Sequence, residues 1–223
     1  MQNIYLVRHG QSDANVLRMF DNSNDGHPLT ELGRSQAQQT AEYFSSLPIR
    51  AMFCSPILRA AQTAEIISQR IGLPVEKMDE FKEFLIGDLN GQPMLGEAHE
   101  TFHNVLNEWA RGNPLASFPN GENHHGLINR FKQGLLKIHL ANPQGDLLVV
   151  AHGGLIIVGV QGTCPNVSWD HLVQEEIPHC SITHLKIQVD EGGLTCELAQ
   201  WADTSHLSHV EKSSPDNLDE SVE

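Results

Sequence analysis

Two histidines, His9 and His152, follow apolar runs and directly precede glycine. LVRHG ends a run that begins at Ile4, and VVAHGG ends the apolar segment GDLLVVAH. The carboxyl ends of parallel strands share one edge of a sheet, and that edge is where such sheets bind ligands. A lone histidine is more often a structural residue, but two with the same local context are expected to meet in one crevice.

Two arginines accompany these histidines. Arg8 stands beside His9, and Arg59 lies in SPILR, where a strand is expected to turn into a helix. Such a junction directs backbone N–H groups and the positive end of the helix dipole toward the crevice, which favours an anion. Guanidinium groups match phosphate oxygens bidentately. Either arginine alone is typical of a surface salt bridge, but two arginines and two histidines at a helix N-terminus predict a phosphate pocket.

The elements that must position these residues alternate along the chain. Apolar runs at 4–7, 50–55 and 145–152 predict strands. A first helix is expected from Glu31 to about Ser46 with Thr30 as its cap, and a second from Pro56 to a stop at Gly72. Further helices are expected at 97–111, 122–141 and 155–160. Residues 181–190 and 193–202 predict a terminal hairpin. This alternation predicts an α/β fold with three αβα layers and a mainly parallel central sheet.

Composition limits the class of protein. The 223 residues, 39% of them hydrophobic, suffice for one sizeable core, so we expect a single domain over residues 1–205. The net charge of −14 argues against a nucleic-acid partner, because a phosphate backbone needs a basic face. Acidic residues dominate the last part of the chain, and we expect residues 206–223 to form a disordered tail.

No segment is expected to enter a membrane. No apolar stretch nears the roughly 20 residues needed to span a bilayer. Arg8 and His9 interrupt the early apolar run, which lacks the pattern of a signal peptide. The cysteines are scattered without CxxC spacing, at Cys54, Cys164, Cys180 and Cys196. We therefore expect a cytoplasmic protein with buried, reduced thiols.

The adjacent histidines His124 and His125 raise the question of a metal site. Neighbouring residues on a helix point apart, and no Asp, Cys or His recurs nearby at ligand spacing. A solvated helix start is the preferred interpretation. We expect no metal and no cofactor.

Several ordered motifs resemble those of the histidine phosphatase superfamily, the phosphoglycerate mutase-like group. They are RHGQSDAN, PLTELGRSQA, SPILRAAQTA, FKEFLIGDLNG and VVAHGG, and the resemblance covers roughly residues 3–190. It implies the phosphoglycerate mutase-like fold, with residues of about 92–141 as a helical insertion over the active site. It also implies a reaction without metal, because arginines supply the positive charge.

The resemblance implies a role for each site residue. His9 would be the nucleophile and form a phosphohistidine that water then cleaves. Glu83 would be the general acid, with the negative charge of the bound phosphate favouring its protonated form. The phosphoryl oxygens would be held by Arg8, Asn15, Arg59, His152 and Gly153. The adjacent arginine charges are expected to lower the pKa of His9, which keeps it neutral for attack.

The superfamily contains both mutases and phosphatases. Cofactor-dependent mutases carry a longer insertion between the acid and the second histidine, and FKEFLIGDLNG looks more like the phosphatase version than the ERHYG-type stretch of mutases. We therefore expect a phosphatase acting on a small phosphomonoester. The alternatives are a mutase-type phosphotransferase, a phosphoprotein phosphatase and a non-catalytic phosphate-binding module.

Three departures from the family pattern put the specificity in doubt. They are Asp88-Leu89-Asn90-Gly91, Gly121-Glu122-Asn123, and His179 where an asparagine often stands. In the family these positions lie near the substrate side of the pocket. The sequence does not fix the oligomeric state. An exposed apolar helix face or the edge of the terminal hairpin would allow a homodimer.

Overall fold

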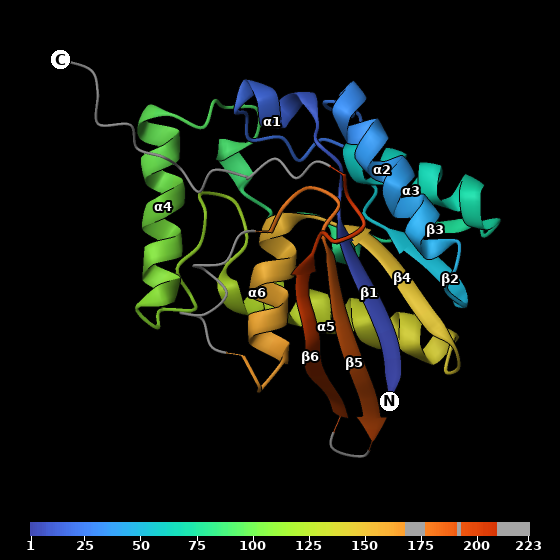
Figure 1. Ribbon diagram of the computed structural model, residues 1–223. Coiled ribbons are helices and arrows are strands. Elements are labelled where there is room, and N and C mark those ends of the chain that lie inside the picture. Colours follow the sequence, from blue (N-terminus) through green and yellow to red (C-terminus); the bar gives the residue numbers. More distant parts are fainter. Residues whose placement is uncertain (168–176, 191–192, 209–223) are drawn as a thin grey trace.

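The computed structural model describes residues 1–167, 177–190 and 193–208. Within them, one six-stranded sheet has the order β3-β2-β4-β1-β5-β6 (Figure 1). The strands are β1 (Gln2–Arg8), β2 (Ile49–Cys54), β3 (Val75–Lys77), β4 (Asp146–Ala151), β5 (Ile182–Asp190) and β6 (Gly193–Asp203). The pairs β1–β4, β2–β4 and β2–β3 are parallel, and β5 pairs antiparallel with β1 and β6. The predicted mainly parallel sheet and terminal hairpin are confirmed.

Helices cover both faces of this sheet. They are α1 (Asp13–Leu17), α2 (Glu31–Phe44), α3 (Leu58–Ile71), α4 (Gly96–Ala110), α5 (His124–Ala141) and α6 (Gly153–Thr163). On β4, Leu148 and Val150 pack with α2 and α3, while Leu147 and Val149 pack with α5 and α6. Because successive strand residues face opposite sides, the alternation of β4 demonstrates the three αβα layers (Figure 1).

A short helix and a short strand are not predicted, and several predicted helix boundaries are wrong. The helix expected at 122–141 begins at His124, and the one expected at 155–160 spans Gly153–Thr163. The polar residues after the first strand are expected to form a loop, but Ser12 and Asn15 form a capping box that starts α1. The three-residue strand β3 at the sheet edge is too short to give a hydrophobic period. The third helix begins at Leu58 with Ile57 as its cap, not at Pro56. Thr30 caps α2 as expected, accepting a hydrogen bond from the Gly33 N–H at 3.0 Å.

The register of the parallel strands aligns the carboxyl ends of β1, β2 and β4, which precede the predicted site residues. Arg8 at the end of β1 pairs with Ala151 at the end of β4. The His9 N–H donates to the Ala151 carbonyl at 3.0 Å, and the Ser55 N–H donates to the Val150 carbonyl at 2.9 Å. The residues that follow β1, β2 and β4 therefore lie at one edge of the sheet, as the histidine pattern predicts.

The last residues that the structure describes, up to Ser208, pack against α2. His206 Nε2 lies 3.1 Å from the Thr40 hydroxyl, and the Ser208 N–H donates to Gln39 at 2.7 Å. The predicted tail began at residue 206, and its residues 209–223 lie outside the described part of the chain, as do residues 191–192 of the predicted hairpin turn.

Two further expectations concern membranes and thiols. In the part of the chain that the structure describes, no helix is both long and apolar enough to cross a membrane. The four cysteines are buried and free of disulfides, as expected.

Candidate active site

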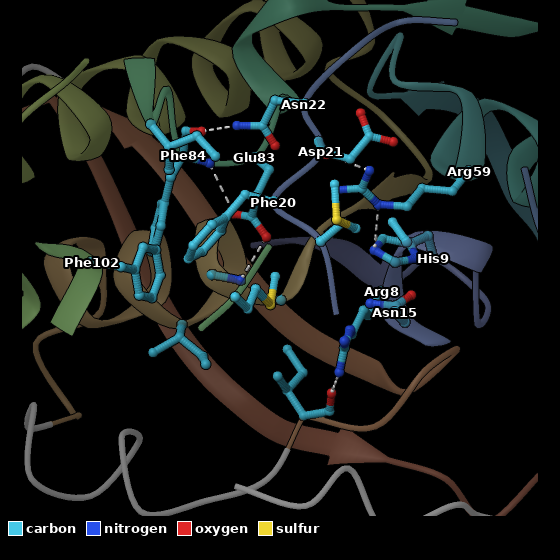
Figure 2. Close-up of a pocket in the computed structure, with 18 residues that line it drawn as sticks. Arg8, His9, Asn15, Phe20, Asp21, Asn22, Arg59, Glu83, Phe84 and Phe102 are labelled. Atoms are coloured by element: carbon cyan, nitrogen blue, oxygen red, sulfur yellow. Dashed lines mark hydrogen bonds between the residues drawn. The ribbon is translucent and has the colours of Figure 1, made fainter. Parts of the chain in front are cut away.

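A cavity of about 400 Å³ opens at the carboxyl ends of β1 and β4. Six of the seven predicted site residues line it: Arg8, His9, Asn15, Arg59, Glu83 and Gly153 (Figure 2). The seventh, His152, is fully buried against the cavity's polar end, where its ring lies 5.1 Å from that of His9. Sequence positions far apart are thus brought into one site.

His9 is held in one orientation by both of its ring nitrogens. Nδ1 lies 2.8 Å from the carbonyl oxygen of Gly10, and Nε2 accepts a hydrogen bond from Arg59 Nε at 3.0 Å. A carbonyl oxygen only accepts, so Nδ1 carries the proton and Nε2 presents a lone pair. This is the neutral tautomer that a nucleophile requires.

The surroundings of His9 favour that neutral form. The ring is buried, with 3% of its surface exposed. Burial, followed by the Arg59 guanidinium, His152 and Arg8, lowers the pKa of His9 well below its usual range. The lone pair on Nε2 therefore persists as the pH falls below neutrality.

Arg8 and Arg59 place two guanidinium groups beside this imidazole. Arg59 Nη1 donates to the Asp21 carbonyl at 2.7 Å, while Arg8 donates to the Ile177 carbonyl. Burial lowers the pKa of Arg8 to about 10, which leaves it charged at neutral pH. Arg8 Nε is buried with no hydrogen-bond partner in the described structure. The buried Arg59 and the partly buried Arg8, both with donor capacity to spare, suit a multiply charged anion.

His152 is oriented by Ser55. His152 Nε2 lies 2.8 Å from the Ser55 hydroxyl, which itself accepts the Ile57 N–H at 3.2 Å. Among the described residues, the Ser55 hydroxyl proton has no other acceptor than Nε2, and its donation to Nε2 places the ring proton on Nδ1. Burial, then Arg59 and Arg8, keeps the pKa of His152 well below its usual range. Nδ1 is a buried atom without a described partner, so it can donate to a bound anion.

Asn15 and the start of α6 add neutral donors. The Asn15 side-chain oxygen accepts from the Ser12 N–H at 3.0 Å and from its hydroxyl at 2.8 Å, so its N–H groups are the part that can donate into the cavity. Gly153 is the first residue of α6, where backbone N–H groups and the helix dipole favour an anion. A Cβ there would lie 3.3 Å from Arg8 Nε, so glycine lets the guanidinium approach.

Glu83 also lines the cavity, held by three backbone groups. Its carboxylate accepts from the Phe84 N–H at 3.0 Å, the Gly154 N–H at 3.0 Å and the Leu155 N–H at 2.7 Å. A Cβ at Gly154 would lie 2.8 Å from Glu83 Oε1, so this close approach requires glycine. The side chain is thus fixed in the cavity that Arg8 and Arg59 also line.

The comparisons with known proteins agree with this geometry. The family model of the histidine phosphatase superfamily (branch 1) matches residues 4–203. The chain belongs to the histidine phosphatase superfamily. The resemblance inferred from the ordered motifs is confirmed.

Similar members of the histidine phosphatase superfamily carry two kinds of name. The uncharacterized phosphatase PhoE of Bacillus subtilis (strain 168) is 31% identical over 89% of this chain and 98% of its own. The probable phosphoglycerate mutase GpmB of Proteus mirabilis (strain HI4320) is 33% identical over 94% and 97%. The solved structure of Bacillus stearothermophilus YhfR has a TM-score of 0.77 at 25% identity, covering 92% of this chain and 99% of its own. The phosphoglycerate mutase-like fold is confirmed.

Two residues at this superfamily site were not assigned a contact from the sequence. His179 Nε2 lies 3.1 Å from Arg8 Nη2, and the backbone of Asp21 holds Arg59. Because a guanidinium only donates, His179 accepts as a neutral ring, and burial, followed by Arg8 and Arg59, keeps its pKa well below the usual range. The departure at His179 was the only signal for it, and Asp21 gave none because its contact uses the backbone.

The sequence also raises the question of a metal site at His124 and His125. Among the described residues, no group of three His, Cys, Asp or Glu side chains lies close enough together to hold an ion. His124 and His125 begin α5, and the exposed His125 fits the predicted solvated helix start. His124 does not, because its ring is partly buried and lies 5.4 Å from that of Trp109.

Replacing Ser55 by alanine is expected to lower kcat/KM by about tenfold, because the hydrogen bond that fixes the His152 tautomer is lost. Inhibition by inorganic phosphate should weaken by a similar factor if His152 holds the phosphoryl group. Steady-state kinetics with Ser46→Ala, an exposed serine at the end of α2, as the control would measure both. Unchanged phosphate inhibition in Ser55→Ala would contradict this role.

Proposed function

We propose that the protein is a phosphatase that hydrolyses a small phosphomonoester through a phosphohistidine on His9. Membership of the superfamily and the similarity to PhoE support a phosphoric monoester hydrolase. The observation that carries the proposal is the neutral His9 ring, whose Nε2 lone pair faces Arg59 at 3.0 Å at the anion-binding end of the cavity. A site that only bound phosphate would have no need of a buried nucleophile beside a carboxyl group.

The phosphoryl group would bind where the donors converge. Arg8, Arg59, His152 Nδ1, the Asn15 amide and the Gly153 N–H would contact its oxygens. A phosphoryl oxygen would take over the N–H of Arg59 Nε and release the lone pair of His9 for attack. These groups are already in position, so they stabilise the charge on the transferring phosphoryl group without reorganisation.

The first step would transfer the phosphoryl group to His9. The bond between Nε2 and phosphorus forms as the ester P–O bond breaks, and the departing oxygen takes a proton from Glu83. The three backbone N–H groups that hold the Glu83 carboxyl group fix its position for this transfer. Glu83 would enter the step as the acid and leave it as the carboxylate.

The second step would release phosphate. Water attacks the phosphohistidine, and its proton passes to the Glu83 carboxylate. The N–P bond breaks, and its electron pair returns to Nε2 as the lone pair of neutral His9. One carboxyl group would thus act first as acid and then as base.

A mutase is the second candidate, favoured by the 33% identity to a probable phosphoglycerate mutase. A panel of sugar phosphates, phosphoglycerates, nucleotides and phosphopeptides separates the candidates. Release of inorganic phosphate from a small phosphomonoester supports the proposal. Interconversion of phosphoglycerates that requires a bisphosphate primer would favour the mutase, and turnover of phosphopeptides alone would favour a phosphoprotein phosphatase.

Activity is expected to survive an excess of EDTA. Arg8 and Arg59 would supply the positive charge that Mg²⁺ supplies in other phosphoryl-transfer sites. The measurement is phosphate release before and after dialysis against the chelator. Loss of activity that a divalent cation restores would contradict this part of the mechanism.

A further inference from the structure

The cavity beyond the arginines is apolar. The rings of Phe20 and Phe102 lie 5.0 Å apart, and those of Phe84 and Phe102 lie 6.2 Å apart. Figure 2 shows Phe84 and Phe102 on the side of the cavity away from His9 and Arg59. Aliphatic side chains also line the cavity, namely Ala14, Met19, Ile86, Met94, Ile157 and Ile177.

This apolar surface continues along α4. A second cavity of about 360 Å³ shares the walls Phe84, Phe102, Gly154 and Ile157 with the first. It extends to Leu106 and Ala110 on α4 and to Val158 on α6, and His103 and Asn107 are its polar side chains. A group that leaves the phosphate end past Phe84 would therefore meet mainly apolar side chains.

The positive charges of the lining lie at one end of the cavity. Among the described residues that line either cavity, the arginines and lysines are Arg8 and Arg59 alone, and both lie at the phosphate end. Each is already tied by a hydrogen bond to a backbone carbonyl there. The other charged side chains of the lining are the carboxylates Asp21 and Glu83. A second anionic group on the substrate would be desolvated without a cationic partner, which is costly.

Glu83 and the aromatic ring of Phe84 are neighbours in the chain and are held in place by shared contacts. The Phe84 N–H donates to Glu83 Oε1 at 3.0 Å, and the Asn22 side chain donates to the Phe84 carbonyl. A Cβ at Gly154 would meet the Phe84 ring at 2.7 Å and Glu83 at 2.8 Å. The atom that receives a proton from Glu83 would therefore belong to a group packed on Phe84.

We propose that the alcohol released by this enzyme is uncharged and apolar, an alkyl chain or aromatic ring that packs on Phe84 and Phe102. The inference rests on the proposed phosphatase function and names its substrate class. Burial of apolar surface would supply the binding energy. Phosphomonoesters with a second anionic group, such as phosphoglycerates, would be poor substrates.

A matched pair of substrates tests the charge preference. Hexyl phosphate and 6-phosphooxyhexanoate release primary alcohols of the same length and differ by a carboxylate at the far end. The wild-type enzyme is expected to show at least about tenfold higher kcat/KM for hexyl phosphate, chiefly through KM. Equal or better turnover of the carboxylate would overturn the inference, while leaving the phosphatase function in place. No phosphate release from any phosphomonoester would overturn the proposed function itself.

Variants at Phe102 test whether the apolar side chains of the cavity cause the preference for an uncharged substrate. Phe102 is a partly exposed residue of α4. Phe102→Ala should raise KM for hexyl phosphate more than for methyl phosphate, which is too short to reach the ring. Phe102→Lys should shift the ratio of the two hexyl substrates toward the carboxylate. Leu140→Ala, at an exposed position on α5, is the control. A substrate ratio that stays at the wild-type value in folded Phe102→Lys would contradict the assignment.

Discussion

Replacing His9 by alanine is expected to abolish turnover of every phosphomonoester, with a loss of at least about 10⁴-fold in kcat, the scale seen when a covalent nucleophile is removed. The physical reason is that the other groups proposed to contact the phosphoryl group are donors to its oxygens, and Glu83 is a carboxylate held by backbone N–H groups. None of them presents an unprotonated nitrogen to phosphorus. Phosphate release over long incubation measures the residual rate.

The control for this variant is another histidine replaced in the same way. His125 is exposed in the first turn of α5, and His125→Ala should keep wild-type activity. His9→Ala leaves Arg59 Nε without its acceptor, which is expected to cost about 1–3 kcal/mol of stability, so thermal unfolding must show that the variant is folded at the assay temperature. Substantial turnover by folded His9→Ala would exclude His9 as the nucleophile.

Replacing Glu83 by glutamine is expected to slow hydrolysis of alkyl phosphates by roughly 10²–10⁴-fold, the usual contribution of general acid catalysis. An alkoxide leaves poorly without a proton, whereas the p-nitrophenolate ion leaves readily. Formation of the phosphoenzyme from p-nitrophenyl phosphate should therefore suffer far less, as a pre-steady-state burst would show. The contrast between the two substrates is the expected signature of a lost acid.

The contrast also separates chemistry from structural damage. Glutamine would turn an NH₂ group toward a backbone N–H that now donates to the carboxylate, and a disturbed pocket would lose both activities together. Asp88→Asn is the matched control, because Asp88 is exposed, binds Asn120 at 2.9 Å and does not line the cavity. Equal losses on alkyl and aryl phosphates in Glu83→Gln would remove Glu83 from the role of general acid.

The fold and most of the site could be predicted because they depend on local sequence patterns. Apolar runs ending in His9 and His152 marked two parallel strands, and parallel pairing alone requires that their ends meet. Arg59 followed from the same rule at the end of β2. The hydrophobic period that marks long strands and helices is absent from α1 and β3, which have five and three residues, so neither could be found in this way.

Contacts between distant loops and backbone groups could not be predicted. Ser55 was visible only as part of a strand–helix junction, although its hydroxyl fixes the His152 ring. The three backbone donors on Glu83 depend on how its loop meets the start of α6, and no residue type in the motif indicates them. The cytoplasmic location, the homodimer and the disordered tail stay predictions from the sequence.

The central claim is that phosphate passes through His9, and trapping the phosphoenzyme tests it most directly. Wild-type enzyme mixed with excess substrate would be quenched within milliseconds in alkaline denaturant, digested, and analysed by mass spectrometry. We predict one phosphate per chain, stable to base and labile to acid, on Nε2 of His9, and none in His9→Ala. Phosphate on a serine, cysteine or aspartate, with His9 unmodified during turnover, would contradict the account.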